Sequence, residues 1–120
     1  MIEELVARVF ATRNTAHLVH WKVSGPGSFA QHMALDAFYN GLIDQIDKIV
    51  EMHQGAFGLM GDVSPLSVPT TKFTEHVAKE AKWIEDNRER IAQDVCALEN
   101  VIDELVGLYL TTYYKLKNLA

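Results

Sequence analysis

Apolar residues recur along most of the chain at the three- and four-residue spacing of an α-helix. The pattern covers about residues 2–23, 29–53, 74–92 and 95–119, and no stretch alternates in the manner of a strand. Each segment has one apolar stripe, which predicts amphipathic helices around a shared core. The stripe residues are Ile2, Leu5, Val6, Val9, Phe10 and Ala16; Leu35, Phe38, Leu42, Ile46 and Ile49; Val77, Ala81, Ile84 and Ile91; and Leu98, Ile102, Leu105, Tyr109, Thr112, Leu116 and Leu119.

Glycine and proline interrupt this pattern in two places. Gly25-Pro26-Gly27 predicts a short turn, and residues 55–71 form a longer break that is rich in both residue types. Ser28 and Asp94 are expected N-caps of the helices that follow them. No glycine or proline separates the third and fourth segments, so one long helix over both remains the alternative.

The length of the second break indicates the topology. A helix of ~25 residues is ~37 Å long, and an extended segment of ~17 residues reaches up to ~56 Å. Residues 55–71 can therefore cross the whole bundle. We expect an all-α, ferritin-like four-helix bundle with one long crossover between helices two and three.

Composition narrows the class of protein. The chain has 120 residues, 48% of them hydrophobic, and a net charge of −5, which predicts one soluble domain spanning residues 1–120. No apolar stretch approaches the ~20 residues of a membrane span. Charged residues occupy the region where a signal peptide has its apolar core, and Cys96 is alone. We therefore expect a cytoplasmic protein without disulfides, with Cys96 buried, and no membrane partner.

On one face of the second predicted helix, carboxylates and apolar residues occur together. Ile43 and Val50 share a helical face with acidic residues, and burying an unpaired charge is costly. A bound metal ion explains this combination. The candidate ligands on this helix form two pairs at i,i+4 spacing, His32 with Asp36 and Asp47 with Glu51.

His20 adds a second imidazole to this set. The turn is centred near residue 26, so His20 and His32 should face each other across the hairpin. Two imidazoles and a carboxylate suit a divalent metal such as Fe, Mn or Zn. Asp36 and Glu51, however, are ~22 Å apart along a helix and cannot bind one ion within one chain. A two-fold axis near Gly41, where the missing side chain permits close approach, would complete two equal sites in a dimer.

These residues resemble the signature of the Dps family, the miniferritins known as DNA-binding proteins from starved cells. The run His20-Trp21-Lys22-Val23-Ser24-Gly25 resembles the family's turn motif. A His follows after twelve residues, an Asp after four more, and then a D-x-x-x-E motif. The five positions that match the family's ligands are His20, His32, Asp36, Asp47 and Glu51.

The resemblance implies a ferroxidase that oxidises Fe²⁺ at a dinuclear-type site shared across a dimer interface. Hydrogen peroxide or dioxygen is the oxidant, and Fe³⁺ is stored in a twelve-subunit cage, so homo-oligomers from a dimer to a dodecamer are expected. Iron storage, detoxification and oxidative protection are the implied roles, and Trp21 beside His20 resembles a tryptophan near the family's iron site. DNA binding is not carried over, because the chain is negative and lacks a basic N-terminal extension.

Other residues favour structural interpretations. For Trp21 a packing role is at least as well supported as a redox role. Tyr39 can be a core residue, an interface residue or a radical sink, and packing is favoured. Core and subunit contacts are expected for Tyr109, Tyr113 and Tyr114. The remaining histidines, His17, His53 and His76, are expected at the surface or at helix ends. The alternative function is a non-catalytic helical interaction protein with a structural or relic metal site.

Overall fold

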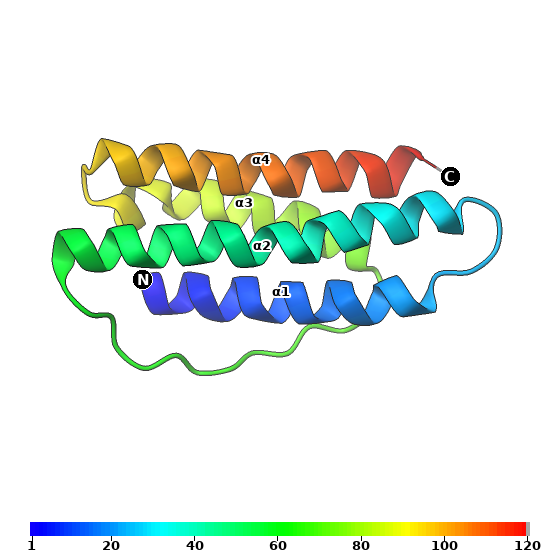
Figure 1. The fold of residues 1–120 in the computed structure, drawn as a ribbon, viewed down its shortest axis with the longest axis horizontal. Coiled ribbons are helices and arrows are strands. Elements are labelled where there is room, and N and C mark those ends of the chain that lie inside the picture. The colour runs from blue at the N-terminus through cyan, green and yellow to red at the C-terminus, as the bar shows by residue number, and fades with distance from the viewer. Residues whose placement is uncertain (120) are drawn as a thin grey trace.

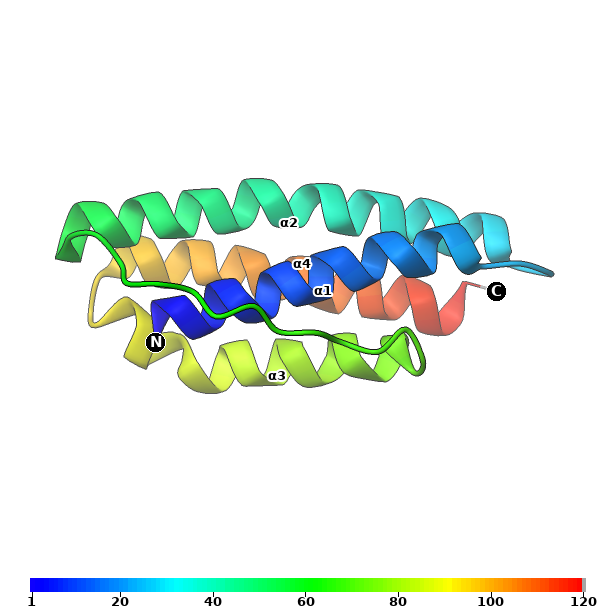
Figure 2. The ribbon, with the colours of Figure 1, turned by 90° about the horizontal axis from the view of Figure 1, so that it is seen from below.

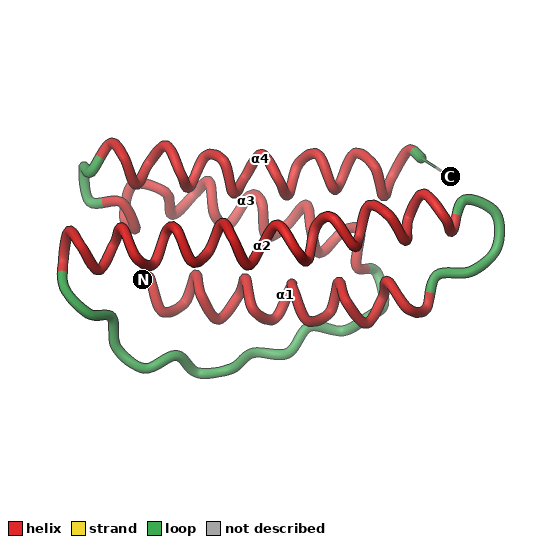
Figure 3. Tube along the Cα trace, in the orientation of Figure 1, coloured by secondary structure: helices red, strands yellow, loops and turns green. Residues whose placement is uncertain are grey.

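The computed structural model describes residues 1–119, and four helices account for most of them: α1 Ile2–Lys22, α2 Ser28–Phe57, α3 Phe73–Ala92 and α4 Cys96–Asn118. This part of the chain contains no strand (Figure 3). The all-helical prediction is confirmed, and three of the four helices have the expected bounds to within two residues. The exception is α2, which continues four residues beyond the predicted end at His53.

Gly58, not Gly55, ends α2. Gly58 has φ 94° and its N–H donates to the carbonyl of Gln54, which is a glycine C-cap. Gly55 lies within the helix, where a glycine costs about 1 kcal/mol relative to alanine but does not stop a long, well-packed helix. The prediction that Ser28 caps α2 is wrong, because Gly27 takes the N-cap position and Ser28 is the first helical residue.

A tight turn separates α3 from α4, so the alternative of one long helix is wrong. Gln93 and Asp94 adopt left-handed backbone conformations with φ 47° and 67°. Asp94 is therefore part of the turn, and Val95 is the N-cap of α4. Left-handed conformations are unfavourable for residues other than glycine. Packing of the two antiparallel helices offsets this cost, because both flanks of the turn have fully buried apolar residues.

Arg88 reinforces the α3–α4 hairpin. Its Nε lies 2.6 Å from Asp103 Oδ1, and its Nη1 lies 2.8 Å from Glu99 Oε2. These ion pairs are partly exposed, and each contributes little to stability on its own. Their shared guanidinium nevertheless fixes one register between the two helices.

The four helices form two antiparallel hairpins, α1 with α2 and α3 with α4 (Figure 1). Each helix also packs against one helix of the other hairpin, α2 against α4 and α1 against α3. The connection between α2 and α3 returns along the length of α1, so α2 and α3 run in the same direction (Figure 2). The molecule measures 47 × 25 × 21 Å.

Two hydrogen bonds hold the crossover segment, residues 59–71, against α1. Near the start of α1, Glu3 Oε2 accepts from the Gly61 N–H at 2.7 Å. Further along, Thr15 Oγ1 donates to the Val68 carbonyl at 2.9 Å. The segment has no helix of its own, and polar groups of α1 satisfy part of its backbone.

The predicted apolar stripes form the core, with two corrections: Phe10 is half exposed at 50%, and Leu119 at the end of α4 is also exposed. Cys96, which was expected to be buried outside these stripes, is exposed. The stripes of α2 and α3 are buried throughout. Of the tyrosines in α4, Tyr109 is fully buried and packs edge-to-face on Phe38 with ring centres 5.1 Å apart, whereas Tyr114 is exposed.

No helix within residues 1–119 combines the length and apolar character that crossing a membrane requires.

Candidate functional site

His20 and His32 lie against each other across the α1–α2 hairpin, as predicted. Their rings are stacked with centres 3.7 Å apart and planes 25° apart. His32 Nδ1 lies 3.0 Å from the backbone carbonyl of His20. Because a carbonyl only accepts, Nδ1 must carry the hydrogen, which leaves the Nε2 lone pair of neutral His32 free for a metal ion. Metal-binding histidines commonly donate their second ring nitrogen to a backbone carbonyl in this way.

Asp36 brings a carboxylate beside these rings. Its Oδ1 lies 3.9 Å from His20 Nε2 and accepts a hydrogen bond from the Tyr39 hydroxyl at 2.9 Å. The Asp36 side chain is 46% exposed, whereas His20 is buried. We call His20, His32 and Asp36 the histidine cluster. It places two imidazoles under one solvent-accessible carboxylate.

The surroundings favour the neutral form of His20. Burial lowers the pKa of this imidazole, and the nearby His32 lowers it further, while Asp36 acts in the opposite direction. Neutral imidazole is the form that binds metal ions. Within residues 1–119, His20 Nδ1 is buried without a hydrogen-bond partner, and the ring nitrogen that faces Asp36 is Nε2.

The hydrogen bond to Asp36 also affects Tyr39. It raises the pKa of the Tyr39 phenol, and burial raises it further. The hydroxyl therefore keeps its proton at physiological pH and remains a donor.

The histidine cluster does not hold a metal ion by itself. Among residues 1–119 no three His, Cys, Asp or Glu side chains are placed to bind one ion. The stacking explains this, because the lone pairs of an imidazole lie in the ring plane and nearly parallel rings do not point at a common centre. A complete site needs either movement of one ring or donors from elsewhere.

Asp47 and Glu51 lie further along α2. Along the helix axis, the distance between Asp36 and Glu51 is ~22 Å. Both are exposed, and neither takes part in an ion pair in the described part of the chain. Both acids lie on α2 at i,i+4 spacing, and within one chain they are remote from the histidines.

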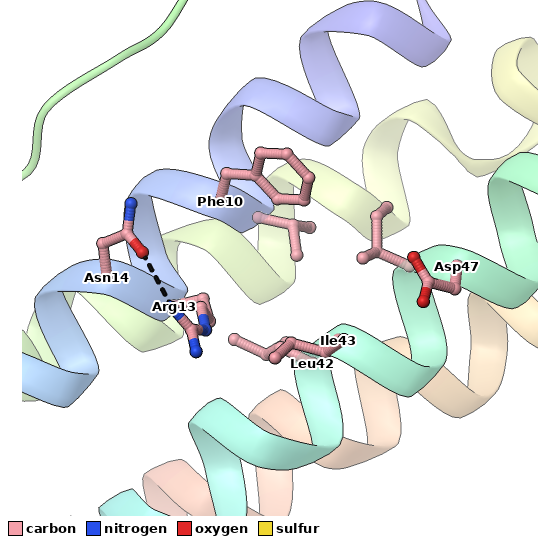
Figure 4. A pocket seen from close by; sticks show the side chains of 8 residues that line it. Phe10, Arg13, Asn14, Leu42, Ile43 and Asp47 are labelled. Atoms are coloured by element: carbon pink, nitrogen blue, oxygen red, sulfur yellow. Dashed lines mark hydrogen bonds between the residues drawn. The ribbon is translucent and has the colours of Figure 1, made fainter.

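Asp47 borders a pocket of about 370 Å³ between α1 and α2 (Figure 4). Phe10 and Ile43 extend over its apolar side, and Arg13 and Asn14 lie on its polar side, joined by a 3.1 Å hydrogen bond. A neighbouring hollow includes both Asp47 and Glu51, with apolar residues from α1, α2 and the crossover segment. Unpaired carboxylates thus sit at the edge of an accessible apolar groove.

Gly41 has a different role from the one predicted. A Cβ atom at this position would lie 3.1 Å from Leu108 Cδ2. The close approach that Gly41 permits is therefore the packing of α2 on α4 within the chain. It gives no support for a close contact between two copies of α2.

Trp21, His17 and Tyr39 make contacts beside the histidine cluster that were not predicted, and His53, near the other end of α2, lies differently from its predicted position. Trp21 is 66% exposed and touches His17, with ring centres 4.5 Å apart, so it is not a core residue. His17 also stacks on Tyr39, at 4.1 Å. His53 is buried rather than on the surface, and burial lowers its pKa. The i,i+3 spacing of His17 and His20 was a sequence signal for a histidine on the same face.

Comparison with known protein families places most of the chain in a family. The model of a family described as a family of unknown function (DUF5856) matches residues 20–116, which is most of the chain and includes all five predicted ligand positions. Comparisons with curated proteins and with solved structures gave no match.

Proposed function

The chain belongs to the DUF5856 family, whose function is unknown, and from its own residues we propose that it oxidises Fe²⁺ in the manner of a miniferritin. The observation that carries the proposal is the split donor set. His20, His32 and Asp36 gather at one end of the α1–α2 hairpin, and Asp47 and Glu51 lie further along α2 without an ion-pair partner among the described residues. Each half is incomplete, and together they form the N- and O-donor set that suits iron.

The order and direction of the helices support this proposal. A four-helix bundle in which one long crossover joins two hairpins is the arrangement of ferritin-like proteins. The segment between α2 and α3 follows such a path along α1. Fold alone does not define function, so the donor residues remain the main argument.

Two copies of the chain can complete each site. If α2 packs antiparallel to its copy about an axis between residues 41 and 42, position 36 faces position 47 of the copy, and position 32 faces position 51. The two-fold symmetry then gives two equal sites, each with the histidine cluster of one chain and the two acids of the other.

The α1–α2 face has properties that favour such a contact. Phe10, Ile43 and Leu18 are exposed apolar residues on or beside it. Arg13 lies beside Tyr39, its guanidinium carbon 5.8 Å from the ring centre, and its Nε is buried without a hydrogen-bond partner within residues 1–119. In the same register position 39 faces position 44 of the copy, so Arg13, which lies beside Tyr39, would face Asp44 of the partner subunit. Apolar area and an unpaired cation opposite an acid are typical of an interface.

The chemistry assigned to this site is a one-electron oxidation of each substrate ion. Two Fe²⁺ ions together would supply the two electrons that, with two protons from solvent, cleave the O–O bond of one hydrogen peroxide molecule and give two water molecules and two Fe³⁺ ions. Asp36, Asp47 and Glu51 would hold the cationic substrate and balance the charge that increases as Fe³⁺ forms. Neutral His20 and His32 would bind through nitrogen and set the geometry. Homo-oligomers larger than the dimer, including a storage cage, remain part of the proposal.

A second candidate function is a non-catalytic helical interaction protein. The stacked imidazoles and the exposed side chains of Trp21 and Phe29 favour it, because exposed aromatic residues are common at binding surfaces. This function predicts folding and assembly that do not depend on the five donors, and no iron-dependent consumption of peroxide.

Anaerobic addition of Fe²⁺ followed by hydrogen peroxide distinguishes the two functions. Wild-type protein should form Fe³⁺ much faster than buffer does, and the variant H32A/D36A should lose this rate while it keeps its helical content. The control is E85A, which removes an exposed acid on α3. Equal rates for H32A/D36A and wild type would refute the proposed ferroxidase.

A further inference from the structure

Within residues 1–119, the Asp36 carboxylate accepts one side-chain hydrogen bond, and its donor is Tyr39. The hydroxyl donates to Oδ1 at 2.9 Å. Asp36 is otherwise free to rotate, because its side chain is half exposed and the nearest imidazole nitrogen lies 3.9 Å away. The orientation of this carboxylate therefore depends on Tyr39.

The Tyr39 ring is itself fixed by contacts from α1. His17 stacks on it with planes 14° apart, and His20 meets it edge-to-face with ring centres 5.3 Å apart. The Arg13 guanidinium lies over the ring as well. Only 8% of Tyr39 is exposed. A ring held by three side chains of another helix cannot easily rotate, so its hydroxyl has a defined position.

We propose that Tyr39 is a positioning residue that holds Asp36 through Oδ1 and leaves Oδ2 as the oxygen that binds a divalent cation. This inference rests on the proposed iron site and adds a residue outside the five donor positions. Tyr39 does not contact the cation; it acts through the carboxylate. Outer-shell partners of this kind reduce the freedom of a ligand before the metal arrives, which raises metal affinity.

A packing role for the ring makes a different prediction from a positioning role for the hydroxyl. The variant Y39F keeps the aromatic ring and its contacts with His17 and His20, and it removes only the donor. Since Asp36 is half exposed, water can satisfy its carboxylate in the variant. The matched control is Y113F, which removes from a half-buried tyrosine of α4 a hydroxyl that makes no hydrogen bond within residues 1–119.

Titration with Co²⁺ tests the proposal, because the visible absorption of Co²⁺ reports both affinity and ligand geometry. The chain of 120 residues is used at a concentration where it is assembled. We expect Y39F to bind Co²⁺ roughly 10–100-fold more weakly than wild type, with a changed absorption spectrum. Y113F should match wild type, and both variants should unfold at the same temperature when no metal is present.

Three results would overturn the proposal in distinguishable ways. If Y39F binds Co²⁺ as wild type does while D36A loses binding, the site stands and Tyr39 has no role in it. If D36A also binds normally, the proposed metal site itself is wrong. If metal-free Y39F unfolds well below Y113F, the hydroxyl serves the stability of the hairpin, and weaker metal binding no longer indicates a positioning role.

Discussion

Two inactive variants should restore each other if every site is built from two chains. The first variant replaces His20, His32 and Asp36, and the second replaces Asp47 and Glu51. Each variant alone forms only sites that lack one half of the donors. In a mixed dimer, the three intact donors of the second chain meet the two intact acids of the first, and one complete site forms.

The expected recovery follows from this geometry. Random pairing of equal amounts makes half of the dimers mixed, and each mixed dimer has one complete site out of two, so activity should approach about a quarter of wild type. The distance of ~22 Å between Asp36 and Glu51 is what rules out a site within one chain. A site formed by local rearrangement of the histidine cluster alone would not use the acids of another chain.

The assay is the initial rate of Fe³⁺ formation after the two variants are unfolded together, refolded and separated from aggregates. Mass spectrometry under native conditions verifies that mixed dimers are present. Mixing the folded variants without unfolding is the control for slow exchange. Verified mixed dimers with no recovered activity would refute the shared-site geometry.

Three further predictions concern the interface, the pH dependence and nucleic acid. R13E should raise the dimer dissociation constant by about tenfold, because it places an acid opposite Asp44 of the partner subunit. R13E/D44K should restore the wild-type value. Equal dissociation constants for wild type and R13E would show that this pairing is absent. Burial lowers the pKa of His20, His53 and His76 in the folded protein. Below about pH 6.5 the unfolded chain therefore binds more protons than the folded one. The free energy of unfolding should be highest above that pH and decline below it. Chemical denaturation across this range checks the decline, and H53Q should make it shallower; an unchanged slope in H53Q contradicts the assignment. DNA binding by the metal-free protein should be weak at about 150 mM salt, since the net charge is −5, and a gel shift at sub-micromolar protein would show otherwise.

Helix positions were predictable because the apolar stripes of the core repeat at helical spacing. The long break between the second and third helices likewise predicted a connection that crosses the bundle. The end of α2 was misplaced because glycine has two roles. Gly55 is tolerated inside a packed helix, while Gly58 ends it by adopting a positive φ of 94° that sequence pattern alone does not indicate.

The contact of His20 with His32 was also predictable, since the register of a short hairpin fixes which residues face each other. The role of Tyr39 was not, because it depends on the rotamers of His17 and Asp36 and on their position across two helices. Gly41 was misinterpreted for a related reason. A missing side chain shows where something approaches closely, but only the packing of α2 shows that the neighbour is Leu108.

The most direct test of the shared site is the effect of metal on assembly. If each ion binds donors from two chains, metal binding and dimer formation must favour each other to the same extent. Sedimentation velocity at a protein concentration near the dimer dissociation constant, with and without Zn²⁺ as a redox-inert probe, measures this coupling. We predict that Zn²⁺ shifts wild type to the dimer and has no such effect on D47A/E51A. Tight binding of Zn²⁺ by a wild-type monomer, with no change in assembly, would contradict a site made of two chains.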